Sequence, residues 1–319
     1  MGPRMSVLTR LEQWKSAGAI SSAQCDVLSA LVRKDRFSVF VELNTLLYLG
    51  VLSFVAGVGW LVATYSADLG DAAILSSLTC VFCWSLYYCF ARALPYSHLQ
   101  VEHPGLAFDY VLYLGCLVFA IELGYLQARV HFLPLDWDSS LLLASVVFFA
   151  LAYRFDNRFV LSLALSSLAG WFGVRVSRFG LVPGGSLRMY ALAYGGLVAV
   201  AGTALYFAGV KQHFLEAYLH IAANVLFLSL LSGVGSRGAE GVFYLLALLG
   251  LAALAVVEGV RFRRFAFVVY GVVFGYAGIS FRLLRDIGSF TPALAYLVVS
   301  GTIVIVTLVV LARRFGRDE

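Results

Sequence analysis

The chain has 319 residues, of which 61% are hydrophobic and only 13% are charged. A soluble domain is about 45–50% apolar and about 25% charged, so this composition excludes a water-soluble fold. The net charge of +5 does not indicate a nucleic-acid partner, because the Lys and Arg residues fall in short connecting segments rather than along one face.

Residues 1–40 are predicted to form a short cytoplasmic helical hairpin. Leu8, Leu11 and Trp14 follow helical spacing, and Gly18 is expected to end that helix. Ser21 and Gln24 have the pattern of a capping box that starts a second helix, which carries Leu28, Leu31 and Val32. Because such a hairpin is too small to bury a core alone, we expect it to dock on the bundle, on a second copy of the chain or on another protein.

Residues 41–312 are predicted to form a transmembrane bundle, and residues 313–319 a cytoplasmic tail. A spanning helix needs about 20 mostly apolar residues. Ten stretches meet or approach this length: 43–64, 72–92, 107–127, 138–153, 158–174, 188–209, 214–232, 240–259, 264–282 and 290–312. The predicted fold class is therefore an all-α, polytopic transmembrane helical bundle of about ten spans with an N-terminal hairpin. Counts of nine or eleven stay open, and the short fourth and fifth stretches could instead form a re-entrant pair.

The basic residues predict the orientation of the chain. With ten spans, sixteen of the 23 Lys and Arg residues fall at the two termini and in the even-numbered loops. Cytoplasmic loops carry an excess of Lys and Arg, so both termini are expected in the cytoplasm. The segment 175–188, with three arginines on the outer side, is the main exception. No cleavable signal peptide is expected, because the first apolar run starts near residue 43, behind a polar segment.

Three of the cytoplasmic connections resemble one another. The sequences YRFDNRF, GVKQHF and GVRFRRF each join two apolar stretches by a short turn rich in basic and aromatic residues. This pattern suggests repeated helical hairpins, which transporters often contain. The alternative is that any short cytoplasmic turn recruits Arg and Phe.

Polar residues inside the predicted spans are the candidate functional residues, since an ionisable group near the bilayer centre costs about 2.5–3.5 kcal/mol. Glu216, His220 and Asn224 recur every four residues and therefore share one helix face. They could form a proton or cation path, because His titrates near neutrality. They could equally form a seam that hydrogen-bonds neighbouring helices.

Glu122 lies in the outer half of the third stretch between apolar residues. We expect Glu122 and the stripe of Glu216, His220 and Asn224 to face one polar interior, which is the candidate intramembrane path. The alternative for Glu122 is a carboxyl group satisfied by a local hydroxyl or by Arg129.

No pattern for catalysis, metal or cofactor binding is found. Cys80 and Cys83 form a C-x-x-C inside an apolar stretch, where packing in the core is expected rather than zinc or redox chemistry. Gly50, Gly57, Gly271 and Gly275 indicate close helix contacts. No nucleophile motif of the G-x-S-x-G kind and no H-E-x-x-H helix occurs, so we expect no enzymatic activity.

The order of the features is similar to one bacterial family. The segments LEQWKSAGAISSAQ at 11–24, LYLGVLSFVAGVGWLVA at 47–63 and LGCLVFAIELGYLQARVHF at 114–132 resemble a predicted membrane protein family, domain of unknown function 2157. The resemblance covers roughly the first 175 residues. It implies an integral membrane protein with a short cytoplasmic N-terminal segment, and it implies no activity. We expect this protein in the inner membrane.

Two functions are therefore expected from different classes. The first is a transporter-like or permease-like protein with a polar path through the membrane. The second is a structural or regulatory membrane component whose N-terminal hairpin binds a partner or a second copy of the chain. A cavity that reaches Glu122 or His220 would favour the first.

Overall fold

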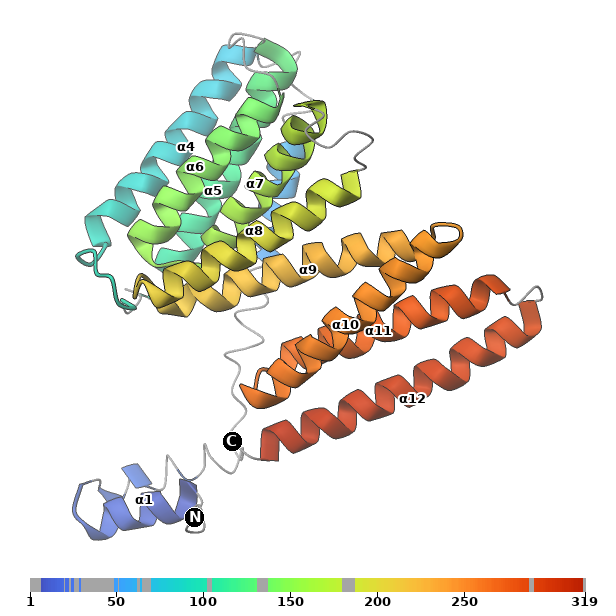
Figure 1. Cartoon of the computed structure of the whole chain (residues 1–319). Helices are drawn as coiled ribbons and strands as arrows, with labels where there is room; N and C mark the ends of the chain where they lie inside the picture. Colours follow the sequence, from blue (N-terminus) through green and yellow to red (C-terminus); the bar gives the residue numbers. More distant parts are fainter. Residues whose placement is uncertain are drawn as a thin grey trace. The chain divides into compact units, whose positions relative to one another are not determined.

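The structure is a computed structural model that describes residues 7–19, 21–22, 24–25, 29, 49–50, 52–61, 64, 70–101, 105–130, 137–179, 187–286 and 290–317. Every regular element among these residues is a helix, as the composition predicted. The chain divides into two units, Met1–Trp60 and Leu61–Glu319, and Figure 1 shows their helices.

The first unit contains helix α1, Val7–Ser16, which ends where the sequence predicted. Gly18 has a positive φ of 72°. Its amide donates to the Lys15 carbonyl at 3.1 Å, and the Ala19 amide donates to the Trp14 carbonyl at 2.9 Å. This pair of bonds is the Schellman motif, which favours glycine because the position needs a left-handed backbone.

The predicted capping box also forms. The Ser21 amide donates to Gln24 Oε1 at 2.9 Å, and the Gln24 amide donates to Ser21 Oγ at 3.2 Å. Cys25, which follows the cap, packs back on α1. Both Cys25 and Leu11 of α1 are buried. Leu28, Leu31 and Val32 lie outside the described residues, so the hairpin as a whole stays a prediction.

The described part of the second unit contains nine α-helices. They are α4 (Asp71–Arg92), α5 (Leu106–Tyr125), α6 (Trp137–Phe155), α7 (Arg158–Phe179), α8 (Leu187–Phe207), α9 (Leu215–Val234), α10 (Ala239–Arg261), α11 (Phe265–Asp286) and α12 (Phe290–Arg317). A π-helical turn, Leu126–Val130, follows α5, and a 3-10 turn, Gln212–Phe214, precedes α9. These helices coincide with nine of the ten predicted stretches, and the remaining stretch, 43–64, contains a helix over Leu52–Leu61.

Seven of the described helices are long and apolar enough to cross a membrane: α4, α5, α8, α9, α10, α11 and α12. Helix α6 provides only a shorter apolar helix, Ser139–Phe155. In α7, Arg158 and Arg175 confine the apolar segment to the residues between them. Seven spans therefore have support from length and composition, and the expected count of about ten is not confirmed.

Consecutive helices pack as hairpins, with the pairs α4/α5, α6/α7, α8/α9 and α10/α11 in extensive contact. The three basic turns that the sequence singled out each close one of these hairpins. Each turn also contains one non-glycine residue with positive φ: Asp156 at 58°, Lys211 at 46° and Arg263 at 55°. The resemblance between the turns is therefore also a resemblance in backbone geometry.

Glycine permits the closest helix contact at one of the predicted positions. A Cβ atom added to Gly271 of α11 would lie 2.5 Å from the backbone oxygen of Ala252 in α10, whereas Gly275 leaves ordinary space. Gly50 and Gly57 have no neighbour within 4 Å of such an atom. A close helix contact is therefore present at Gly271, whereas at Gly50 and Gly57 none is seen among the described residues.

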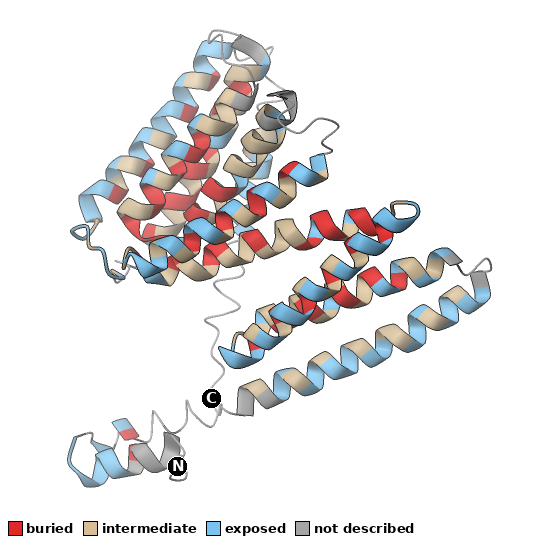
Figure 2. Cartoon of the chain, in the orientation of Figure 1, coloured by how far each residue is buried: buried red, intermediate tan, exposed pale blue. Residues whose placement is uncertain are grey.

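Buried and exposed residues are distributed as in a membrane bundle. Buried residues follow the faces where helices meet, and exposed residues lie on the outward faces (Figure 2). Many of these exposed residues are large and apolar. A buried cluster joins α9 to α10 through residues that include Phe227, Val234 and Leu248. The apolar stretch of α12 has no buried residue at all, and residues such as Ile305 are 63% exposed. So much exposed apolar surface is typical of helices that face lipid.

Candidate functional site

Glu122 lies near the C-terminal end of α5 and is hydrogen-bonded by a residue of a neighbouring helix. The Thr79 hydroxyl of α4 donates to its carboxylate. At the same end of this hairpin, the Tyr125 hydroxyl donates to Asp71. A local hydroxyl was one of the partners expected for Glu122 and is present here, while the side chain of the other expected partner, Arg129, lies outside what the structure describes.

Glu216, His220 and Asn224 follow one another along α9, as their spacing predicted. Arg158 at the start of α7 forms a salt bridge with Glu216 at 3.1 Å, and both side chains are half exposed. The His220 imidazole lies 3.9 Å from the other oxygen of Glu216, which is longer than a hydrogen bond. Asn224 donates to the Tyr270 hydroxyl of α11 at 2.9 Å. The stripe therefore links α9 to both α7 and α11.

The His220 ring is held by aromatic side chains. It stacks on Phe267 with ring centroids 4.9 Å apart and meets the Tyr270 ring at an angle of 68°. Its Nδ1 atom is buried and has no hydrogen-bond partner in the structure. A buried polar atom without a hydrogen-bond partner costs free energy, so a structural or functional reason is expected for this imidazole.

The structure does not bring Glu122 together with the stripe. Their contacts lie in different helix pairs, α4/α5 for Glu122 and α7/α9/α11 for the stripe. No hydrogen bond or ion pair of the described residues connects the two groups. A shared polar interior for Glu122, Glu216, His220 and Asn224 consequently stays a prediction.

A buried ion pair, which the sequence analysis missed, lies at the basic turns. Lys211 Nζ is 3.0 Å from Asp156 Oδ2, and the two side chains are 1% and 3% exposed. His213 Nε2 contacts the other oxygen of Asp156. We call Asp156, Lys211 and His213 the Asp156 cluster.

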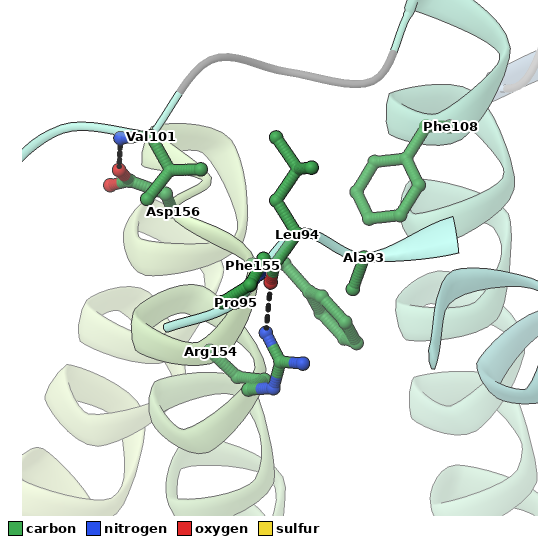
Figure 3. Close-up of a pocket in the computed structure, with 8 residues that line it drawn as sticks. All are labelled: Ala93, Leu94, Pro95, Val101, Phe108, Arg154, Phe155 and Asp156. Atoms are coloured by element: carbon green, nitrogen blue, oxygen red, sulfur yellow. Dashed lines mark hydrogen bonds between the residues drawn. The ribbon is translucent and has the colours of Figure 1, made fainter. Parts of the chain in front are cut away.

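The Asp156 cluster fixes the segment that follows α4 against two turns. The Val101 amide donates to Asp156 at 2.6 Å (Figure 3), and Lys211 Nζ donates to the Leu99 carbonyl at 3.3 Å. Asp156 belongs to the α6–α7 turn and Lys211 to the α8–α9 turn. The sequence signal that could have found this pair is the acidic residue of one basic turn and the lysine of the next.

A small cavity lies beside Asp156. Figure 3 shows its lining, with the Arg154 guanidinium donating to the Leu94 carbonyl at 3.0 Å. Its volume of about 20 Å³ accommodates about one water molecule and no larger ligand. The contacts around it are therefore structural.

A much larger cavity lies between α8, α9 and α10 and has a volume of about 390 Å³. This volume falls in the range of ligand sites, about 300–1,000 Å³. Its lining is mostly apolar, with Ala199 of α8, Leu219 and Ala223 of α9, and Leu251 and Leu254 of α10 among the residues. We call it the α8–α10 cavity.

The α8–α10 cavity opens toward the outside of the bundle. Two of its lining residues, Leu254 and Tyr206, are 61% and 40% exposed. The lining of α10 runs from Leu251 to the turn at Phe262, about 16 Å along the helix axis. That length matches half of the bilayer's hydrocarbon core of about 30 Å. The cavity is therefore about as long as one leaflet is thick.

The charged residues at this cavity, Glu258 and Arg264, were missed by the sequence analysis. They are the only charged residues among those that line the cavity in the described structure. Glu258 lies in the last turn of the apolar helix α10, and an ionisable residue inside a span is itself a signal of function. His220 does not line the cavity, although Phe267, on which it stacks, does.

The cysteines do not form a reactive site. Cys80 and Cys83 are free and exposed on one face of α4, so the expectation that they pack in the core is wrong. Lipid accommodates a small apolar thiol as well as a core does. No group of three His, Cys, Asp or Glu side chains in the described ranges could hold a metal ion.

These features define an α-helical integral membrane protein with an apolar cavity in one half of its bundle. Residues 12–161, just under half of the chain, match the model of the family described as Predicted membrane protein (DUF2157). The resemblance seen in the sequence is therefore confirmed for this part of the chain. Neither the curated proteins nor the solved structures contain a match.

Proposed function

We propose that this protein binds a lipid-like amphiphile, with the apolar chain in the α8–α10 cavity, and that it acts as a transporter-like membrane protein rather than as an enzyme. The observation that carries the proposal is the cavity itself, which is apolar, about one leaflet long and open at exposed lining residues of α8 and α10. In this proposal the three basic turns of the protein face the cytoplasm, which is the orientation that the distribution of Lys and Arg favours.

An empty apolar cavity of this size costs free energy. Its lining atoms would lack dispersion contacts on one side, and that loss grows with cavity volume. A lipid chain from the surrounding bilayer restores these contacts. Because lipid tails are as apolar as the lining, the chain gains little free energy from burial alone. The shape of the cavity and its two charged residues, Glu258 and Arg264, must therefore determine which molecule is retained in it.

A matched pair of variants on α8 tests this proposal. Ala199 lines the cavity and Ala201 is exposed elsewhere on the same helix. Ala199→Phe should fill the cavity and lower the amount of lipid that survives purification in detergent, while Ala201→Phe should retain lipid like the wild type. Lipid bound per protein is measured by native mass spectrometry. Equal retention by the two variants would contradict the proposal.

Transport is tested separately from binding. In proteoliposomes that contain a fluorescent phospholipid, dithionite destroys only the dye in the outer leaflet. Wild-type protein should increase the fraction of dye that dithionite reaches with time, and Ala199→Phe should not. Lipid binding without movement of the dye would leave a binding protein and remove the transporter-like role.

A second candidate function is the proton path expected from the sequence. The specific observation in its favour is His220, whose Nδ1 is buried without a partner, at the end of the series from Arg158 through Glu216. His220→Gln should abolish any pH-driven flux into proteoliposomes without reducing lipid retention. Unchanged flux in this variant would remove the proton path.

A further inference from the structure

We propose that the α8–α10 cavity selects a phospholipid with a primary ammonium headgroup, whose phosphate binds Arg264 and whose ammonium binds Glu258. This inference rests on the proposed function, since the acyl chain of the same molecule occupies the cavity. It adds the chemical class of the headgroup and the residue that recognises each of its charges.

The two charged residues lie at the same end of the cavity. Glu258 is in the last turn of α10. The Arg264 amide donates to the Gly259 carbonyl at 2.8 Å, so the turn folds Arg264 back beside that last turn. Both side chains line the cavity. The charged end therefore lies where α10 leaves the membrane, which is the depth of a headgroup.

The Arg264 guanidinium lies within electrostatic range of the His220 imidazole, but neither the Glu258 nor the Arg264 side chain has a direct polar partner among the described residues. No hydrogen bond or ion pair of the described residues engages the carboxylate of Glu258 or the guanidinium of Arg264. Partly desolvated charges without a partner are costly, and a ligand that carries both a cation and an anion satisfies both at once. Arginine suits the phosphate because its planar fork donates two parallel hydrogen bonds.

The acidic residue decides between classes of phospholipid. A headgroup with only a phosphate, as in phosphatidylglycerol, is attracted by Arg264 and by the neighbouring exposed arginines but is repelled by Glu258. A choline headgroup carries the positive charge but has no N–H group to donate to the carboxylate. Phosphatidylethanolamine offers the phosphate and three N–H donors on its ammonium, so it satisfies both residues.

The first test varies only the lipid and uses the wild-type protein. Purified protein is incubated with phosphatidylethanolamine, its N-methyl and N,N-dimethyl forms, phosphatidylcholine and phosphatidylglycerol, all with the same acyl chains. Native mass spectrometry then reports the lipid retained. We expect retention to fall with each methyl group and to be about tenfold lower for phosphatidylcholine and phosphatidylglycerol. Equal retention of all five lipids would overturn the inference.

The second test uses variants of the protein, and gel filtration and circular dichroism check that each variant folds. Glu258→Gln should remove the preference for phosphatidylethanolamine over phosphatidylglycerol, and Arg264→Gln should lower retention of both. Arg261→Gln is the matched control, because Arg261 is an exposed arginine of the same turn that does not line the cavity. An unchanged preference in Glu258→Gln, or the same loss in Arg261→Gln, would contradict the assignment.

The two proposals fail in different ways. If the five lipids are retained equally and Ala199→Phe retains none, the lipid-binding function stands and the headgroup assignment is wrong. If Ala199→Phe and Ala201→Phe retain equal amounts, the function itself is wrong, whatever the headgroup preference.

Discussion

Breaking the buried pair of Asp156 and Lys211 should destabilise the bundle more than any other change of charge in the described structure. Lys211→Met leaves the Asp156 carboxylate buried with only the Val101 amide and His213 as partners. Removing one partner of a buried ion pair costs about 3–5 kcal/mol, because the other charge stays desolvated. Asp156→Asn should cost a similar amount, since it leaves the Lys211 ammonium with the Leu99 carbonyl.

The double variant gives the sharper test. Asp156→Asn combined with Lys211→Met removes both charges, so neither is left uncompensated. Its cost should be smaller than the sum of the two single costs by at least about 2 kcal/mol, which is the coupling energy of residues in one network. Each substitution sits at the same positive-φ position in the single and in the double variant, so its change in backbone strain cancels in the coupling energy.

The measurement is the free energy of unfolding in mixed detergent micelles, followed by circular dichroism as sodium dodecyl sulfate increases. Glu216→Gln is the control, because its salt bridge with Arg158 is half exposed and should be worth less than about 1 kcal/mol. The reasoning would be refuted if the single variants at Asp156 and Lys211 lost less free energy of unfolding than Glu216→Gln. It would also be refuted if the loss in the double variant equalled the sum of the two single losses.

Two further predictions concern the helices themselves. Asn157→Ala should lower the free energy of unfolding by about 2 kcal/mol in the same assay, at the upper end for a helix cap. Asn157 Oδ1 accepts hydrogen bonds from the amides of Phe159 and Val160, and its Nδ2 donates to Asp109. A loss below about 0.5 kcal/mol would show that the cap is dispensable. Gly271→Ala should destabilise the protein by about 1–3 kcal/mol, since the new Cβ would lie 2.5 Å from the Ala252 backbone oxygen. Gly250→Ala should stabilise it by about 0.5–1 kcal/mol, since no atom lies within 4 Å of a Cβ added there. A change of the same sign at both glycines would contradict the packing.

The helix positions were predictable because each depends on local sequence. Apolar stretches of spanning length gave nine of the helices of the second unit, and Gly18, Ser21 and Gln24 gave the end of α1 and the cap that follows it. The basic turns were recognised by composition, and their common positive φ follows from the same need to reverse the chain in a few residues. The number of spans was not predictable, because α6 and α7 are near the limits of length and polarity.

The candidate site was not predictable from the sequence. Glu258 and Arg264 are near neighbours in the sequence, but the cavity that they line is formed by the packing of α8, α9 and α10. Asp156 and Lys211 lie in different turns, and hairpin packing alone brings them together. The stripe on α9 was found because its residues repeat with the helical period, although its partners, Arg158 and Tyr270, belong to other helices.

The two walls of the α8–α10 cavity are held in different ways, and this difference indicates which wall moves when a ligand enters. The α8–α9 turn is fixed by the ion pair of Lys211 with Asp156. The α10–α11 hairpin meets α9 through the buried apolar cluster, through the stacking of Phe267 on His220, and through the hydrogen bond from Asn224 to Tyr270. Apolar and aromatic surfaces can slide past one another without leaving a buried charge unpaired, whereas breaking an ion pair leaves one. We therefore expect α10 to move. Spin labels at Tyr206 and Leu254 should give a broader distance distribution in delipidated protein, and addition of phospholipid should narrow it; a distribution that does not respond to lipid would show that both walls are rigid.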